Sequence, residues 1–342
     1  MRSRAFITRV EKTPGSLRRA LDEALDYIGW ANDIHRNDRV FLKPNLTWKE
    51  HIPGVTVSPT FLTALLEAMR ERVNHLTIGE SNGGYHGFNA DEAFQGHGLV
   101  DVCKRLDVKL VNLSTVQRKK MTGTILGQLV WAEVPAMLVD DTDVFMTVPV
   151  PKIHAMTHVS IAFKNQWGCM PDVMRLRRHP EFYHTILFLN KILRVHYAVC
   201  DGITMLDQNG PMIGVPVEMD TVIAANNPGA ASMVGCQIMG IDPWSIKTHQ
   251  MALKEGMFPA SSAEVEVNAD PGLFFKKKFV LNAHLTNRVA RAAFNSQALT
   301  KVIYDSTFGD KLHDAFYTVR RWPVWGRVFY GEVGPPEVKG HR

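Results

Sequence analysis

Hydrophobic positions along the first half of the chain alternate between short continuous runs and runs with helical spacing. The continuous runs predict β-strands, and the periodic runs predict helices whose apolar side chains share one face. Alternation of strand and helix is typical of βαβ units, which assemble into a mostly parallel sheet with flanking helices. The expected strands are residues 4–10, 39–42, 75–79, 108–113 and 143–148, with a strand or a hairpin at residues 130–139. The expected helices are residues 16–30, 58–69 and 89–106.

The second half shows the same two patterns with less regular alternation. Helices are predicted at residues 157–167, 181–193, 229–239 and 243–255, and strands at residues 196–200 and 221–225. Because no repeat or low-complexity linker separates the halves, we expect an interwoven α/β fold. Its parts are a sheet domain over residues 1–150 with a ligand crevice at the strand ends, a second lobe over 151–270 that completes the crevice, and a basic C-terminal extension over 271–342.

The composition is that of a folded globular protein. Of the 342 residues, 45% are hydrophobic and 21% are charged, which allows a sizeable core and excludes a disordered chain. The longest uncharged run, residues 221–241, contains Asn226, Asn227, Pro228 and Gln237, which are costly inside a bilayer. The first residues have no apolar leader pattern. We expect no transmembrane segment and a cytoplasmic location.

The net charge of +5 is unevenly distributed. From Pro271 onward the chain carries twelve lysines and arginines against five acidic residues, including Lys276, Lys277 and Lys278. Residues 320–327 interleave further arginines with tryptophans. A segment of this kind suits either a solvated face or contact with an acidic partner. We expect a protein partner, where there is one, to dock on this region, and we expect no nucleic acid partner.

The four cysteines are far apart in the sequence and contain no Cys-x-x-Cys pair; they are Cys103, Cys169, Cys200 and Cys236. An iron–sulfur cluster is therefore not expected. Reduced thiols in a cytoplasmic protein are the simpler interpretation.

Ionisable or amide residues follow four of the predicted strands. In open parallel sheets, ligands bind outside the carboxyl ends of the strands, where the connecting loops open. If these four strands are parallel neighbours, their following side chains converge on one crevice. The residues that we expect there are Lys43, Asn45, Glu80, Lys152, His154 and Asp201.

The residue types in this crevice favour acid/base chemistry on an anion. His154, Lys152, Glu80 and Asp201 are the candidate catalytic groups, because they gain or lose protons. Lysines and amides suit a carboxylate or a phosphate, so the candidate binding residues are Lys43, Asn45, Lys164, Asn165 and Asn209. A divalent metal is an alternative occupant, and its ligands would then be His154, Glu80 and Asp201.

The ordered motifs of the chain resemble those of the domain of unknown function 362 family. The resemblance covers residues 39–255 and rests on Lys43-Pro44-Asn45, Gly79-Glu80-Ser81, Pro151-Lys152-Ile153-His154, Ala162-Phe163-Lys164-Asn165-Gln166-Trp167-Gly168, Asp201-Gly202, Asn209-Gly210-Pro211 with Gly214, and Ile223 through Met239-Gly240-Ile241-Asp242-Pro243. The family name records an unassigned activity, so the resemblance implies a fold and a set of positions rather than a reaction.

Two departures from the family pattern change what the resemblance implies. Many members carry a ferredoxin-like cysteine cluster, which this chain lacks. The family usually reads Asp-Asp-Pro-x-Ala-x-Asp where this chain has Asn226-Asn227-Pro228-Gly229-Ala230-Ala231-Ser232, so neutral groups replace carboxylates. A fainter similarity over residues 57–79 is to the N-terminal domain of lactate racemase-like proteins, which use a nickel-bearing nucleotide cofactor.

Three functions remain open at this point. The first is an enzyme of a specialised biosynthetic pathway, acting as an isomerase, lyase or oxidoreductase on a small anionic metabolite. The second is a redox or racemase-like protein that binds a metal or metallocofactor. The third is a non-catalytic accessory protein that docks a partner through its basic C-terminal region.

Overall fold

The computed structural model of the chain describes residues 2–282, 299–300 and 302–303. Within these residues ten strands form one sheet, with its main path in the order β12-β1-β11-β10-β7-β2-β3-β4. The strands of this path are β1 (Ser3–Arg9), β2 (Arg39–Pro44), β3 (His75–Glu80), β4 (Lys109–Asn112), β7 (Val144–Val148), β10 (Val195–Asp207), β11 (Val215–Ala225) and β12 (Val265–Val267). Two short strands, β8 (Lys152–His154) and β9 (His158–Ser160), join the sheet through β10.

The middle of the sheet is parallel. β10, β7, β2, β3 and β4 are consecutive parallel neighbours, whereas β11 runs antiparallel to both β10 and β1. Every residue of β7 is buried, as expected for a strand that is covered on both faces. The predicted α/β class with a mostly parallel sheet is confirmed. The four strands after which the site residues were expected, β2, β3, β7 and β10, are neighbours in the sheet, although Asp201 lies inside β10 and Lys152 and His154 form β8.

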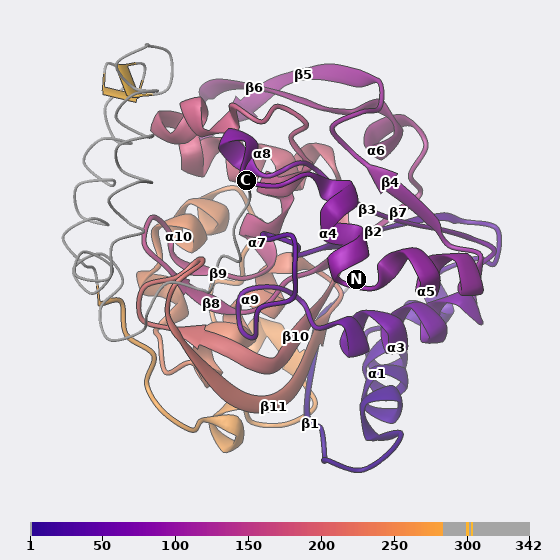
Figure 1. Ribbon diagram of the computed structural model, residues 1–342. Helices are drawn as coiled ribbons and strands as arrows, with labels where there is room; N and C mark the ends of the chain where they lie inside the picture. The colour runs from indigo at the N-terminus through magenta and orange to yellow at the C-terminus, as the bar shows by residue number, and fades with distance from the viewer. Residues whose placement is uncertain (1, 283–298, 301, 304–342) are drawn as a thin grey trace, which may run out of the picture.

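Helices cover both faces of the sheet (Figure 1). One face is covered by α1 (Ser16–Tyr27), α3 (Pro59–Arg70), α4 (Ala90–Gly96) and α5 (Leu99–Leu106), and the other by α8 (Phe182–Ile192), α9 (Pro228–Ile238) and α10 (Lys247–Lys254). The short helices are α2 (Trp30–Asp33), α6 (Ala136–Asp140) and α7 (Ala162–Asn165). The start of α3 follows the sequence signal, because the Ser58 hydroxyl accepts a hydrogen bond from Phe61 N at 3.2 Å and Pro59 occupies the first turn.

The predicted helix over residues 157–167 is wrong. This stretch forms β9, a sharp turn and the single helical turn α7, followed by the 3₁₀ helix η2 (Gln166–Cys169). Val159 and Ile161 are β-branched and favour extended backbone, and His158 has a φ of 68° in the left-handed region. As a result His154 and His158 lie opposite each other across the antiparallel β8–β9 pair.

A separate two-stranded hairpin lies beside the main sheet. It consists of β5 (Arg118–Ile125) and β6 (Gln128–Pro135), which pair along their whole length. Its buried side chains pack against α8. Of the strand or hairpin expected over residues 130–139, residues 130–135 belong to β6 of this hairpin, whereas residues 136–139 are helical and belong to α6.

The expected domain boundaries fall within one continuous structure, because strands from residues 1–150 and from 151–270 join the same sheet. The first residues of the expected extension also pack on this body. Phe279 is 1% exposed, and its N–H donates to Met239 O at 2.8 Å. The basic run at 320–327 lies outside the described residues. In the part of the chain that the structure covers, no helix is both long and apolar enough to cross a membrane.

Candidate functional site

Lys43 and Glu80 lie side by side at the carboxyl ends of β2 and β3. Lys43 Nζ donates to Glu80 Oε2 at 2.5 Å, and the two side chains are only 1% and 5% exposed. Glu80 also accepts hydrogen bonds from two backbone N–H groups, from Leu46 at 3.1 Å and from Ser81 at 3.0 Å. A buried carboxylate with this many partners is fully satisfied. Glu80 is therefore held as an ion-pair partner in the protein interior.

Gly168 closes this ion pair from one side. A Cβ atom at this position would lie 2.8 Å from Glu80 Oε1 and 3.1 Å from Lys43 Nζ. Real Cβ atoms essentially never come as close as 2.8 Å to another heavy atom, so any larger residue forces the pair to shift. The glycine that ends the Gln166-Trp167-Gly168 motif is thus required by packing against the site.

An amide network connects the ion pair to Lys152. Asn165 Nδ2 donates to Lys43 O and to Thr147 Oγ1, both at 2.9 Å, and its Oδ1 accepts from Asn45 Nδ2 at 3.2 Å. Lys152 Nζ donates to Asn45 Oδ1 at 2.8 Å and to Val55 O. Burial, with a contribution from the charge of Lys164, holds the pKa of Lys152 well below its ordinary value. The network brings five predicted residues together: Lys43, Asn45, Glu80, Lys152 and Asn165.

Lys164 lies on α7, next to this network, and its amine has no such partners. None of the described residues places a hydrogen-bond acceptor within reach of its Nζ, which lies 5.8 Å from the centre of the Phe182 ring. Enclosure by the protein, followed by the positive charge of Arg175, lowers the pKa of Lys164 to about 8. The Lys164 residue is nevertheless partly exposed to solvent. It is therefore a reachable amine that titrates close to neutral pH.

His154 is held in one neutral tautomer. Its Nδ1 accepts hydrogen bonds from the backbone N–H groups of Met156 at 3.0 Å and Thr157 at 3.4 Å, so the ring proton is on Nε2. Burial, then the charges of Lys164 and Lys152, keep the pKa of His154 well below its ordinary value. His154 thus presents an N–H donor, because its other nitrogen is occupied by the backbone.

Arg175 and His179 also lie near Lys164, and neither was among the site residues predicted from the sequence. Arg175, at the start of η3 (Arg175–Glu181), is 7% exposed and donates to the backbone carbonyls of Met170, Asp172 and Asn82. His179, in the same segment, packs on the Phe182 ring with 4.7 Å between ring centres. Its Nδ1 lies 2.6 Å from Leu176 O, and burial lowers its pKa to about 4. The 3₁₀ segment has no strand or helix periodicity, so no sequence signal placed these groups beside Lys164.

The carboxylate of Asp201 is bound to the protein backbone. The residue is inside β10, and its carboxylate accepts from Ser58 N at 2.8 Å and from Ile203 N at 3.1 Å. It therefore fixes the backbone at the start of α3. Burial raises the pKa of Asp201 to about 6, although these hydrogen bonds oppose the shift. Asn209 is also buried, and its Oδ1 has no partner among the described residues.

The alternative metal set of His154, Glu80 and Asp201 is not assembled. In the ranges that the structure describes, no three histidine, cysteine or acidic side chains are grouped so as to hold a metal. Glu80 is paired with Lys43, and Asp201 is bound to the backbone near α3. A histidine metal ligand usually donates its second N–H to a carbonyl or carboxylate, whereas His154 Nδ1 accepts from two N–H groups. These three residues do not fit a metal ion.

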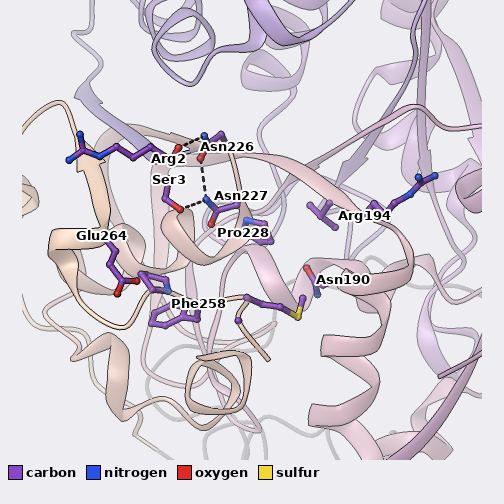
Figure 2. Close-up of a pocket in the computed structure, with 13 residues that line it drawn as sticks. Arg2, Ser3, Asn190, Arg194, Asn226, Asn227, Pro228, Phe258 and Glu264 are labelled. Atoms are coloured by element: carbon purple, nitrogen blue, oxygen red, sulfur yellow. Dashed lines mark hydrogen bonds between the residues drawn. The ribbon is translucent and has the colours of Figure 1, made fainter. Parts of the chain in front are cut away.

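A cavity of about 610 Å³ lies at the opposite edge of the sheet, where β11 ends and β1 and β10 begin (Figure 2). Its amides are already engaged, because Asn227 Oδ1 accepts from Ala230 N at 2.8 Å and Asn226 bonds to the backbone of Arg2 and Arg4. The guanidinium groups of Arg2 and Arg194 point away from each other in this view. The neutral Asn226-Asn227 pair, noted above as a departure from the family pattern, is thus at a different place from the lysine site.

The fold and the site define an α/β protein with a buried, lysine-rich polar site at the carboxyl ends of parallel strands. The family model described as domain of unknown function (DUF362) matches residues 40–237 of the chain. The chain belongs to this family, and the matched range contains every candidate site residue named above.

Similar proteins are recognisable at low sequence identity. A thylakoid-associated protein of Synechocystis sp. is 26% identical over 258 residues, which cover 72% of this chain and 78% of that protein. Among solved structures, the lactate racemase apoprotein from Thermoanaerobacterium thermosaccharolyticum aligns with a TM-score of 0.46 and 14% identity over 69% of this chain. A Thermotoga maritima protein aligns with a TM-score of 0.33 and 13% identity over 58% of this chain. The present chain spans 56% and 51% of those two chains.

Proposed function

We propose that the protein is an enzyme that binds a small carboxylate or phosphate compound beside Lys164 and moves a proton on it. The observation that supports this proposal most is the state of Lys164. Its amine is enclosed and cationic below pH 8, and none of the described residues gives it an acceptor. A largely enclosed charge without a partner is costly, and an anionic ligand would reduce that cost.

The charges around Lys164 favour an anion over a cation. Beyond the effect of burial, the charge of Arg175 contributes to the lowered pKa of Lys164, and the charge of Lys164 contributes to the lowered pKa of Lys152. The buried carboxylate of this region, Glu80, is already neutralised by Lys43 at 2.5 Å. A carboxylate or phosphate group would therefore enter an excess of positive charge and meet charge-assisted donors.

Lys164 and His154 fit complementary roles in proton transfer. A pKa of about 8 leaves part of the Lys164 amine neutral near pH 7, so it can accept a proton and return it. In the proposed step, the neutral amine takes the proton from the carbon next to a carboxylate, and the electrons of the broken C–H bond form an enolate. The Nε2–H of His154 then donates to the enolate oxygen, as a neutral imidazole does in known proton-transfer sites.

This proposal changes the roles that the sequence indicated. Lys152 was expected to be catalytic, but its amine is held by Asn45 and Val55 and serves the network. Lys164 was expected to bind the substrate, and we assign it the proton transfer in addition to anion binding. Isomerisation and elimination both begin with this abstraction, so either reaction fits the proposed site.

Anion binding is the first test of this function. Wild-type protein would be unfolded thermally in the presence of inorganic phosphate, sulfate or small mono- and dicarboxylates, and compared with Lys164→Met and with Lys191→Met. Lys191 is an exposed lysine on α8 that pairs with Glu255, so its variant controls for the loss of one charge. We expect at least one anion to raise the Tm of wild type and Lys191→Met but not of Lys164→Met. Equal stabilisation of all three proteins, or none by any anion, would refute the proposal.

A further inference from the structure

A small void borders Lys164 on the side of α9 and α10. Its volume is about 10 Å³, and it is lined by Val159, Ile161, Phe163, Lys164, Ser232, Thr248 and His249. Two of the lining groups are hydroxyls that are out of contact with solvent. Ser232 Oγ and Thr248 Oγ1 are buried and have no hydrogen-bond partner among the described residues. Buried hydroxyls without partners cost free energy, so each requires an explanation.

The third polar group of the void is a histidine in a defined state. His249 Nδ1 lies 2.9 Å from Pro243 O, an acceptor, so the proton is on Nδ1 and the lone pair is on Nε2. Its ring stacks on Phe258 with 4.5 Å between centres, and burial lowers its pKa to about 4. His249 is therefore neutral and supplies an acceptor, whereas Lys164 supplies a donor.

The size and the chemistry of the void suit a single water molecule. A cavity needs at least about 10–15 Å³ to hold one water molecule, and that water needs two to four polar partners. Here the hydroxyls of Ser232 and Thr248 can each donate or accept, and Lys164 and His249 provide one donor and one acceptor. A carboxylate or phosphate is too large for this space. The void is therefore separate from the place that we propose for the anion.

We propose that Ser232 and Thr248 are positioning residues, which hold one water molecule in this void against Lys164 and thereby support the amine in its charged form. This inference rests on the proposed function of Lys164 and adds two residues on α9 and α10 to it. The water would give the amine the hydrogen-bond acceptor that no described residue supplies.

The other charged and titratable groups around Lys164 make its protonation sensitive to this water. Arg175, Lys152, His154 and His179 face it from η3 and β8, and His249 faces the void from α10. All of these groups are cationic or neutral. Two acids, Glu80 and Asp172, act on Arg175, and Glu80 is paired with Lys43. A carboxylate placed in the void would add a negative charge beside Lys164 on the side of α9 and α10.

The first test replaces Ser232 by aspartate and measures the protonation of Lys164 itself. Lysine side-chain amines can be followed by ¹⁵N NMR as a function of pH in the ligand-free protein, with Lys164→Arg to assign the signal. In Ser232→Asp we expect the pKa of Lys164 to rise from about 8 toward the ordinary value of about 10.4. An unchanged titration in a folded Ser232→Asp protein would overturn the proposal, because Ser232 would then not face the amine.

The second test removes the hydroxyls and does not require a buried charge to be accommodated. Ser232→Ala with Thr248→Val should lose the water and lower the pKa of Lys164 further, whereas Thr185→Val should leave it unchanged. Thr185 is a matched control, since its hydroxyl is also buried without a partner but lies outside the void. Equal titrations of Lys164 in the double variant and in wild type would overturn the proposal. Because no substrate is used, this failure is distinct from a failure of the proposed function.

Discussion

The amine of Lys43 donates to the carboxylate of Glu80 at 2.5 Å across two neighbouring parallel strands, and both side chains are almost completely buried. The pair is connected to Lys152 through the amides of Asn165 and Asn45, because Asn165 donates to Lys43 O and Asn45 accepts from Lys152. Ion pairs of this kind tolerate the loss of both partners better than the loss of one, because a single remaining charge is left unpaired in the interior.

The ion pair gives the first prediction. Glu80→Ala should lower the free energy of unfolding by about 3–5 kcal/mol, because it leaves the Lys43 amine buried without its counterion and two backbone N–H groups without an acceptor. Lys43→Met combined with Glu80→Leu should recover part of that loss. Urea unfolding curves measure both effects. A double variant as unstable as the sum of the single variants would show that the two residues act independently.

Asp201 provides a prediction that separates a structural role from a catalytic one. Asp201→Ala should cost about 2–4 kcal/mol of stability, because the N–H groups of Ser58 and Ile203 lose a buried charged acceptor. Once folded, the variant should bind the same anions as wild type. Loss of anion binding in a folded Asp201→Ala protein would restore the catalytic role that the sequence suggested.

The raised pKa of Asp201 also has a consequence for stability. The folded state binds its proton more tightly than the unfolded state, with a pKa of about 6 against an ordinary value of about 3.9. The contribution of Asp201 to stability is therefore full below about pH 4 and is lost as the pH rises to about 6. Unfolding free energies of wild type and Asp201→Asn over this interval should diverge, with wild type losing more stability. Parallel curves would contradict the assignment.

The lowered pKa of Lys164 should make the protein more stable as the pH rises in the alkaline range, the opposite of the effect of Asp201. The folded pKa of Lys164, about 8, lies below the ordinary lysine value of about 10.4, so the unfolded state binds more protons between these values. Stability from this residue therefore increases as the pH rises from 8 to 10.4. In Lys164→Met the slope of the unfolding free energy against pH should be smaller, by up to the contribution of about one bound proton. Identical slopes in wild type and variant would mean that the amine titrates normally.

The tautomer of His154 is accessible to NMR. Two backbone N–H groups point at Nδ1, so at pH 6 the ring should be neutral, with its proton on Nε2. The ¹⁵N shifts of the imidazole measure this directly, and His154→Gln assigns the signal. A charged ring at pH 6 would be incompatible with the hydrogen bonds to Met156 and Thr157.

The sequence predicted the sheet and the positions of the strand ends well, because buried parallel strands read as continuous apolar runs. The Val-Phe-Leu run before Lys43 and the Phe-Met-Thr-Val run before Pro149 are examples, and both form central strands. The same logic brought Lys43, Asn45, Glu80 and Lys152 to one place, and the structure adds Asn165 to their network. The sequence could not show that these residues form hydrogen bonds with one another, because those bonds depend on side-chain geometry.

The errors came from segments whose structure depends on tertiary contacts. Residues 157–167 have apolar spacing compatible with a helix, but the left-handed turn at His158 and the pairing of β9 with β8 prevailed. Asp201 was expected at the end of a strand, whereas β10 continues to Asp207. Arg175 lies in an irregular segment without periodicity, so only the folded structure shows that its charge acts on Lys164.

The most direct test of the central claim is hydrogen exchange on the bound anion. Carboxylates that stabilise the wild-type protein would be incubated with it in D₂O, and proton NMR would follow loss of the signal from the carbon next to the carboxylate. We expect exchange with wild type and Lys191→Met, and a rate at least about 100-fold lower with folded Lys164→Met. Exchange at the wild-type rate in Lys164→Met, or no exchange with any stabilising carboxylate, would contradict the central claim.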